Sequence, residues 1–368
     1  MKKILITANS SFALWNFRGK LIKLISKKYD LHIAVPLLEG DLAQESHFPT
    51  SKIYMKNTNK GIISNLISFA SCFYVVVKQK PDLILSFTIK NNVFFGIISR
   101  LLGIKFIPNV TGVGSYQEDL NFFQLLILKP LYRFSMRGAN HIFFQNSFDR
   151  DFFIKSNFTE PQKNSILPGS GIDLSVFEFV QKDYVNAKQF IFLFASRLLK
   201  EKGIESFINA AIRINNNHSN NNVRFIVCGE HDKNDSRYVD ASLMKKIKSI
   251  KNIEYVGKIS DVKTLIADSS CVVLPSSYNE GVPRILIESL AIGRPIITTN
   301  RPGCKVTLKV GETGYFTKEY DEVDLSNTMI KIMNKDPAEL EIMSHSCREL
   351  AEKSFSDEII ISEYLAKI

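Results

Sequence analysis

The sequence predicts an α/β protein with two Rossmann-like domains, each built on a parallel sheet. Short apolar segments typical of buried strands alternate with segments of helical periodicity along the whole chain. The 368 residues are long enough for two domains with separate cores, and 45% of them are hydrophobic. This composition excludes a disordered protein.

The first half of the chain begins with a short apolar run followed by polar residues, which predicts a first strand rather than a signal peptide. A predicted helix begins near Arg18 and Gly19, where a glycine at a turn lets a backbone approach a ligand. A second loop, at Thr111 and Gly112, follows a later strand. The predicted strands of this half are residues 3–8, 31–36, 81–87 and 104–110.

Residues 61–77 form a charge-free run that contains several serines. Its apolar residues recur at helical spacing, at positions 62, 63, 66, 67, 70, 73, 74 and 77. This pattern predicts an amphipathic helix with its stripe in the core, and not a membrane span.

Residues 122–137 combine large apolar side chains with Lys129, Arg133 and Arg137. A basic amphipathic helix of this kind can lie in a membrane interface, and a core helix with a charged edge has the same pattern. The formal net charge is +10, and most of the excess lies in residues 1–180. This asymmetry favours an anionic partner such as a membrane surface, while no nucleic-acid-binding motif is present.

The second half repeats the alternation, with strands predicted at residues 190–195, 223–229, 253–257 and 271–275. The five cysteines show no CxxC spacing, which predicts buried thiols in a reducing compartment. No Asp-x-Asp motif follows a strand at a position suited to a metal, so the sequence predicts no metal dependence.

The stretch LPSSYNEGVPRILIESLAIGRP, residues 274–295, reads as strand, loop and helix. Pro283 suits the first turn of the helix, and Gly293 suits its end. The backbone N–H groups of such a first turn, at the positive end of the helix dipole, are suited to bind phosphate.

Glu280 and Glu288 bracket this helix start. Carboxylates repel phosphate but accept hydrogen bonds from hydroxyls, so the pair suits a diphosphate with hydroxyls on both sides, as in a nucleotide sugar. The alternative is an ordinary amphipathic helix with an Arg284–Glu288 ion pair.

Arg197 lies just after a predicted strand, and Lys202 just before a helix. Two fixed cations at such a place can stabilise the negative charge that develops on a leaving diphosphate. An exposed basic loop would have the same composition.

The segments EGVPRILIE and SRLLKEKG resemble the E-x7-E and R-x4-K-G motifs of glycosyltransferase family 4. The resemblance implies a GT-B fold, with two Rossmann-like domains facing across a cleft. It implies an acceptor-side domain at 1–170, a donor nucleotide-sugar domain at 171–352, and a helix at 353–368 that crosses back to the first domain.

The family pattern also assigns roles to residues. Glu280 would contact the transferred sugar and, with Arg197 and Lys202, act in catalysis, while Glu288 would hold the ribose. The remaining donor-binding residues that it implies are Gly257, Lys258, Gly281, Val282, Pro283 and Arg284. On the acceptor side, SFALWNFRG resembles members that build cell-surface glycans and contributes Arg18 and Gly19. Thr111 and Gly112 stand where many members carry a histidine, as in the subgroup acting on lipid-linked sugars.

The resemblance thus implies a retaining transferase that moves a hexose or N-acetylhexosamine from a UDP-sugar to a lipid-diphosphate-linked saccharide. An α linkage in bacterial O-antigen, capsule or related surface-glycan synthesis is expected, without cofactor or metal. The expected location is the cytoplasmic face of the membrane, as a peripheral protein. The alternatives are a sugar-nucleotide epimerase of the same fold and a non-catalytic glycan-binding module.

Overall fold

The computed structural model describes residues 1–36, 48–55, 61–112, 122–217, 222–232, 235 and 237–368. The chain divides into two compact units. The first comprises Met1–Gly171 together with Ile360–Ile368, and the second comprises Ile172–Ile359.

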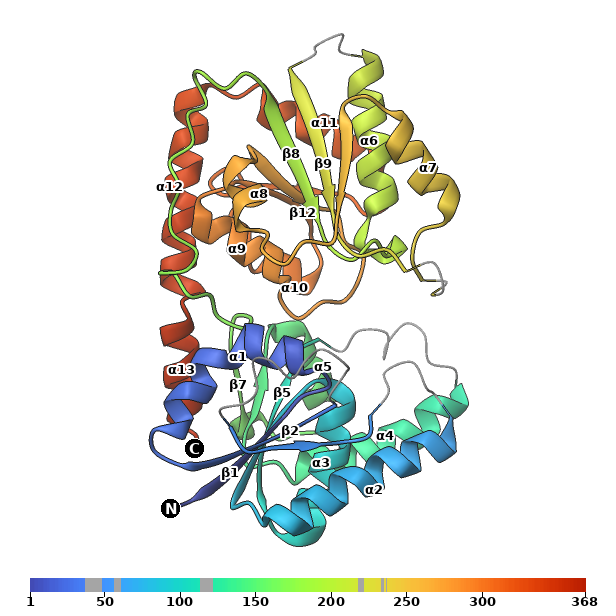
Figure 1. The fold of residues 1–368 in the computed structure, drawn as a ribbon, viewed down its shortest axis with the longest axis vertical. Coiled ribbons are helices and arrows are strands. Elements are labelled where there is room, and N and C mark those ends of the chain that lie inside the picture. The colour runs from blue at the N-terminus through green and yellow to red at the C-terminus, as the bar shows by residue number, and fades with distance from the viewer. Residues whose placement is uncertain (37–47, 56–60, 113–121, 218–221, 233–234, 236) are drawn as a thin grey trace. The chain divides into compact units, whose positions relative to one another are not determined.

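The first unit contains a seven-stranded sheet in the order β3-β2-β1-β4-β5-β6-β7, and every neighbouring pair is parallel (Figure 1). The elements of this unit are β1 (Lys3–Thr7), α1 (Ser11–Ser26), β2 (Asp30–Val35), β3 (Thr50–Lys52), α2 (Ile62–Gln79), β4 (Leu83–Phe87), α3 (Ile89–Leu102), β5 (Lys105–Val110), α4 (Phe122–Arg137), β6 (Ile142–Phe144), α5 (Ser147–Lys155), η3 (Pro161–Lys163), β7 (Asn164–Ile166) and most of α13 (Asp357–Leu365).

The second unit contains a six-stranded sheet in the order β10-β9-β8-β11-β12-β13, again with parallel neighbours. Its elements are β8 (Phe190–Ala195), η4 (Lys200–Lys202), α6 (Ile204–Asn217), β9 (Val223–Cys228), α7 (Ala241–Ser249), β10 (Ile253–Gly257), α8 (Lys263–Asp268), β11 (Cys271–Leu274), α9 (Arg284–Ile292), β12 (Ile296–Thr299), α10 (Pro302–Lys305), β13 (Gly314–Thr317), α11 (Glu322–Met333) and α12 (Pro337–Ser354).

Apolar strands fill both sheets because helices cover both faces. In the first unit, one core lies between the sheet and α1 and includes side chains of α13. A second core lies on the opposite face, against α2, α3 and α4. Tyr364 of α13 is buried in the first of these cores, where its hydroxyl accepts a hydrogen bond from Nδ2 of Asn109. The predicted fold class, two parallel-sheet α/β domains, is confirmed.

The start of α1 differs from the prediction. The helix begins at Ser11, because Ser10 is its N-cap and accepts a hydrogen bond at Oγ from the N–H of Ala13, at 3.3 Å. Gly19 is therefore inside the helix, and a Cβ at this position would lie 3.9 Å from Trp15. The prediction of a turn at Gly19 is wrong.

Helix α2 also differs from the prediction, because its apolar stripe faces outward. Ile62, Ile63 and Leu66 are 80%, 75% and 63% exposed, whereas Ser64 and Ser68 are buried. Among the described helices, α2 alone is long and apolar enough to cross a membrane, judged by length and composition. Its prediction as a core-facing stripe is wrong.

The five cysteines are all buried and form no disulfide, as predicted. Burial raises the pKa of Cys72 and of Cys304 to about 12, so both thiols are protonated at neutral pH.

Candidate active site

The loops that carry the predicted site residues of the second unit lie at one edge of its sheet. Because all six strands are parallel, their carboxyl ends meet at the same edge. Arg197 follows β8, Gly257 ends β10, and Glu280 lies in the loop between β11 and α9. The topology therefore gathers residues from loops that are distant in the sequence.

Helix α9 begins at Arg284, after Pro283 with φ −63° and ψ 122°. Pro283 provides no side-chain cap of the kind that Ser10 provides for α1. The helix ends at Ile292, and Gly293 follows with φ +85°, a conformation that favours glycine. A Cβ at Gly293 would also lie 2.4 Å from the ring of Phe179. The sequence prediction of this helix is therefore correct to within one residue at its start.

Lys202 and Glu280 form an ion pair at the mouth of this helix start. Nζ of Lys202 lies 2.5 Å from Oε1 of Glu280, and the two side chains are only 8% and 15% exposed. Ser276 donates a hydrogen bond to the same carboxylate oxygen at 3.1 Å. The Lys202 ammonium also lies 5.1 Å from the ring centre of Tyr278. The Glu280 carboxylate is thus held by a cation and a hydroxyl in a largely dehydrated place.

The turn that carries Lys202 is fixed against the loop after β11. The hydroxyl of Ser277 donates to the carbonyl oxygen of Glu201 at 3.2 Å, and its N–H donates to the same oxygen at 2.9 Å. Gly203 has φ +79°, and a Cβ there would lie 2.2 Å from the carbonyl oxygen of Pro275. The glycine after Lys202 therefore lets the two loops approach closely enough for the ion pair.

Glu288 and Arg284 form the second pair of the site. Nε of Arg284 donates to Oε1 of Glu288 at 2.8 Å, and Glu288 is only 8% exposed. Burial raises the pKa of the Glu288 carboxyl, and the Arg284 guanidinium opposes this shift in part. This is the ion pair that the alternative interpretation of the helix requires.

The other predicted residues of this edge differ in exposure. The side chain of Arg197 is exposed, and its carbonyl oxygen accepts a hydrogen bond from the N–H of Leu199 at 2.7 Å. Gly257 has φ +77° and open space where a Cβ would be. Lys258 forms an exposed ion pair with Glu230 at 3.0 Å. Gly281 and Pro283 are buried, and Val282 is half-buried.

The predicted acceptor-side residues belong to the first unit. Arg18 is 5% exposed, and its Nη1 donates to the carbonyl oxygen of Ser170 at 2.7 Å. Its guanidinium lies 4.9 Å from the ring centre of Phe87. Thr111 and Gly112 are half-buried after β5, with Gly112 at φ +116°, and the rest of that loop lies outside the described residues.

The structure adds residues to this edge that the sequence analysis did not select. Ser276 and Tyr278 contact the ion pair described above. Gly303 lies at the start of α10, and a Cβ there would lie 1.9 Å from the carbonyl oxygen of Gly281. Arg301 donates to Asn279 at 3.3 Å and to Glu319 at 2.7 Å. The sequence signal for the last two is the NRPG segment directly after a buried strand.

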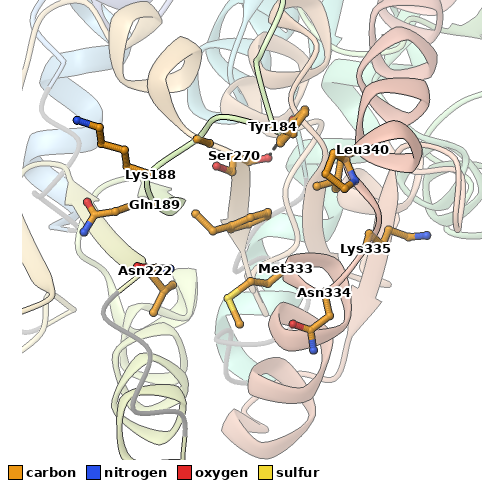
Figure 2. Close-up of a pocket in the computed structure, with 13 residues that line it drawn as sticks. Tyr184, Lys188, Gln189, Asn222, Ser270, Met333, Asn334, Lys335 and Leu340 are labelled. Atoms are coloured by element: carbon orange, nitrogen blue, oxygen red, sulfur yellow. Dashed lines mark hydrogen bonds between the residues drawn. The ribbon is translucent and has the colours of Figure 1, made fainter.

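A cavity of about 240 Å³ lies elsewhere in the second unit, near the amino ends of β8 and β9 (Figure 2). Lys188, Gln189 and Asn222 line it from the connections that precede these strands, and Met333 and Lys335 line it from the end of α11. None of the predicted site residues lines this cavity. Among the described residues, no group of three or more His, Cys, Asp or Glu is placed to hold a metal ion.

Comparison with known families decides the affiliation of the chain. Residues 176–354 match the model of glycosyl transferases group 1, and residues 3–146 match that of a glycosyl transferase 4-like domain. The chain belongs to the glycosyl transferases group 1 family. The resemblance seen in the two sequence motifs is thereby confirmed.

Several curated glycosyltransferases are similar to this one over most of their length. CapM of Staphylococcus aureus, a capsular polysaccharide biosynthesis glycosyltransferase, is 26% identical over 98% of this chain and 94% of its own. The N,N'-diacetylbacillosaminyl-diphospho-undecaprenol alpha-1,3-N-acetylgalactosaminyltransferase of Campylobacter jejuni is 23% identical over 97% and 96%. An Escherichia coli relative, named UDP-Gal:alpha-D-GlcNAc-diphosphoundecaprenol alpha-1,3-galactosyltransferase, is 24% identical over 81% and 78%.

Solved structures confirm the GT-B fold of this glycosyltransferase. Anabaena HepE, solved with UDP and glucose, has a TM-score of 0.79 at 18% identity, with both chains covered completely. WaaG, a glycosyltransferase involved in lipopolysaccharide biosynthesis, has a TM-score of 0.73 at 17% identity, over 97% of this chain and 98% of its own.

Proposed function

We propose that this protein transfers a hexose or N-acetylhexosamine, with retention, from a UDP-sugar to a saccharide on a lipid diphosphate in bacterial surface-glycan synthesis. The observation that carries the donor side is the Lys202–Glu280 pair beside the first turn of α9. The acceptor side rests on the names of two relatives, both of which act on undecaprenyl-diphosphate-linked sugars. The same two names specify α linkages, which supports retention when the donor is an α-linked UDP-sugar.

In this proposal, the donor diphosphate binds at the first turn of α9, between the two ion pairs. Transfer breaks the bond between the anomeric carbon of the sugar and the diphosphate oxygen, and a hydroxyl oxygen of the acceptor bonds to that carbon. Negative charge develops on the leaving diphosphate, which takes up the proton of the acceptor hydroxyl. Lys202, Arg197 and the N–H groups of the turn stabilise that charge. Glu280 accepts hydrogen bonds from sugar hydroxyls, and Glu288 from those of the ribose. UDP and UDP-glucose bound to HepE make UDP the nucleotide to test first.

A donor and acceptor screen tests the proposal. UDP- and GDP-sugars are incubated with a short-chain lipid-diphosphate-linked saccharide, and the products are analysed by mass spectrometry and by NMR of the new linkage. We expect a single added sugar in an α linkage, with activity retained in excess EDTA because protein cations stabilise the leaving group. Conversion of the donor without acceptor would indicate an epimerase instead. Glycan binding without turnover of any donor would indicate a binding module.

A further inference from the structure

Helix α2 turns an apolar surface away from the protein. We call this surface the α2 outer face, and it consists of Ile62, Ile63, Leu66, Ile67, Phe73, Tyr74 and Val77, each at least 38% exposed. Monomeric soluble proteins rarely leave contiguous apolar surfaces of this kind in water, which marks the face as an interaction site.

The orientation of α2 is fixed by contacts on its inner side. Cys72, Val75 and Val76 are buried in the core beneath the helix. Ser68 is buried and donates to the carbonyl oxygen of Ser64 at 2.8 Å. Small side chains on the inner side let the helix pack closely. The inner side of the helix carries serines and a few apolar residues that pack into the core. The remaining apolar residues therefore form a stripe on the outer side.

The charged residues of α2 and of the two helices beyond it have one sign. Helix α2 lies against α3, and α3 against α4 (Figure 1). The three helices contain no Asp or Glu in their sequences, whereas Lys or Arg occurs in each of them. These cations are Lys78 in α2, Lys90 and Arg100 in α3, and Lys129, Arg133 and Arg137 in α4.

Two of these cations lie near aromatic rings of α2 and α3. The Lys78 ammonium is 5.8 Å from the ring centre of Tyr74, which belongs to the α2 outer face. The Lys90 ammonium is 5.7 Å from that of Phe94, and Phe94 contacts Phe69 of α2 edge-on at 5.7 Å. An apolar stripe bordered by cations and aromatic rings is typical of helices that lie in a membrane interface.

The geometry points to the α2 outer face as a membrane-binding surface that enters the boundary between the headgroups and acyl chains of an anionic bilayer. The neighbouring cations would contact the lipid phosphates. Helix α2 would lie along the membrane rather than cross it, because Cys72, Val75 and Val76 belong to the protein core. A second copy of the chain fits less well, since a symmetric contact would bring surfaces of like charge together. The inference deepens the proposed function, on which it rests for the membrane-bound acceptor.

Vesicle sedimentation of the full chain tests this surface. The double variant Ile63→Gln/Leu66→Gln keeps good helix formers and removes two exposed apolar groups. Its partition onto vesicles of phosphatidylcholine with phosphatidylglycerol should fall by at least about tenfold, because membrane affinity of an interfacial helix scales with the apolar area that it buries. The matched control Val323→Gln/Ile342→Gln alters two exposed apolar residues of the second unit and should bind like the wild type.

Varying the salt concentration separates the electrostatic part of the vesicle binding from the apolar part. Neutralising Lys129, Arg133 and Arg137 with Gln should remove much of the salt-sensitive binding, because surface charges are screened over roughly 8 Å at physiological ionic strength. The Ile63→Gln/Leu66→Gln variant should lose the part that persists in high salt. Equal loss of both parts in the two variants would contradict separate roles for the apolar face and the cations.

A fluorescence measurement tests insertion directly. The chain has one tryptophan, Trp15, which lies in α1 against the opposite face of the sheet. In a Trp15→Phe/Tyr74→Trp variant, brominated lipids should quench the new indole, and they should leave Trp15 of the wild type unquenched.

Two results would overturn the inference. One is unchanged vesicle binding of Ile63→Gln/Leu66→Gln together with an unquenched Trp at position 74. The other is a dimer in solution that this variant converts to a monomer, with no lipid binding by either form, which would assign the face to a second copy. Because transfer to a short-chain soluble acceptor does not need the membrane, loss of membrane binding with intact transfer separates this inference from the proposed function.

Discussion

Lys202 and Glu280 are joined by an ion pair of 2.5 Å between Nζ and Oε1, although they belong to loops that follow different strands. The Lys202 ammonium, which we propose binds the donor diphosphate, is thus held in place by a carboxylate. Preorganised charge of this kind stabilises a transition state without reorganisation during the reaction. The pair links the two sequence motifs of the chain in one site.

The first prediction concerns the rate. Lys202→Ala should lower kcat by about 10²–10³, the usual effect of removing one electrostatic contact to developing charge. The matched control is Lys200→Ala, since Lys200 is exposed in the same turn and should be dispensable. Steady-state kinetics with the donor and a soluble acceptor measure both, and wild-type turnover by Lys202→Ala would exclude it from the site.

The same variant leaves the Glu280 carboxylate without its cation in a place where it is 15% exposed. Its thermal unfolding should therefore be measured beside that of Lys202→Ala/Glu280→Gln, which removes both charges. The double variant should unfold at a higher temperature than Lys202→Ala, because an unpaired buried charge costs more than a neutral pair. This comparison separates a loss of rate from a loss of folding.

The second prediction concerns the close approach at Gly203. Gly203→Ala should be more destabilising than Gly311→Ala, and it should also abolish transfer. Both positions have positive φ, which costs an alanine about 1–2 kcal/mol. Only at Gly203 would the new Cβ also collide with Pro275, whereas Gly311 has open space. Urea unfolding and activity assays measure the difference, and equal effects at the two positions would contradict the steric account.

The third prediction concerns stability at low pH. Burial, aided by Lys367, lowers the pKa of His141 to about 4, against about 6.5 in an unfolded chain. As the pH falls from about 6.5 towards 4, the unfolded chain gains a proton at this position that the folded chain does not. The free energy of unfolding should therefore fall over this range.

His141→Gln should make this fall shallower, because it removes one group that titrates differently in the two states. His345→Gln serves as the control, since His345 is exposed. Urea unfolding at pH 7 and pH 5 measures the change. If His141→Gln and the wild type lose the same free energy of unfolding between these pH values, the assignment to His141 is wrong.

Sequence reasoning located the α9 region well, because its signals are local. Pro283 and Gly293 are residues whose backbone preferences set the limits of a helix, and parallel-sheet topology then fixes which edge they reach. The hydrogen bond from Ser276 to Glu280 could not be predicted, because it depends on the path of the loop between them. The sequence shows Gly203 as part of a motif, but it could not predict the steric role of this glycine. That role depends on Pro275, which is distant in the sequence.

The prediction for helix α2 is wrong for a different reason. Periodicity predicts an apolar stripe but not whether that stripe faces the core or the outside of the protein. Apolar residues usually face inward, but in α2 Ser64 and Ser68 face inward instead. The predicted helix start near Gly19 is wrong because Ser10 caps the helix nine residues earlier, and this capping signal outweighs the glycine.

The central claim is that one donor binds with its ribose at Glu288 and its sugar at Glu280. Calorimetric titration of UDP into Glu280→Gln, Glu288→Gln and the exposed control Glu254→Gln tests it most directly. A hydrogen bond to a charged group contributes roughly 1.5–3 kcal/mol, so Glu288→Gln should weaken UDP binding by about tenfold or more. Glu280→Gln should bind UDP as well as the wild type does, because UDP carries no transferred sugar and Lys202 is retained, yet it should lose kcat with the complete donor. The opposite result, with UDP binding lost in Glu280→Gln and kept in Glu288→Gln, would contradict this orientation of the donor.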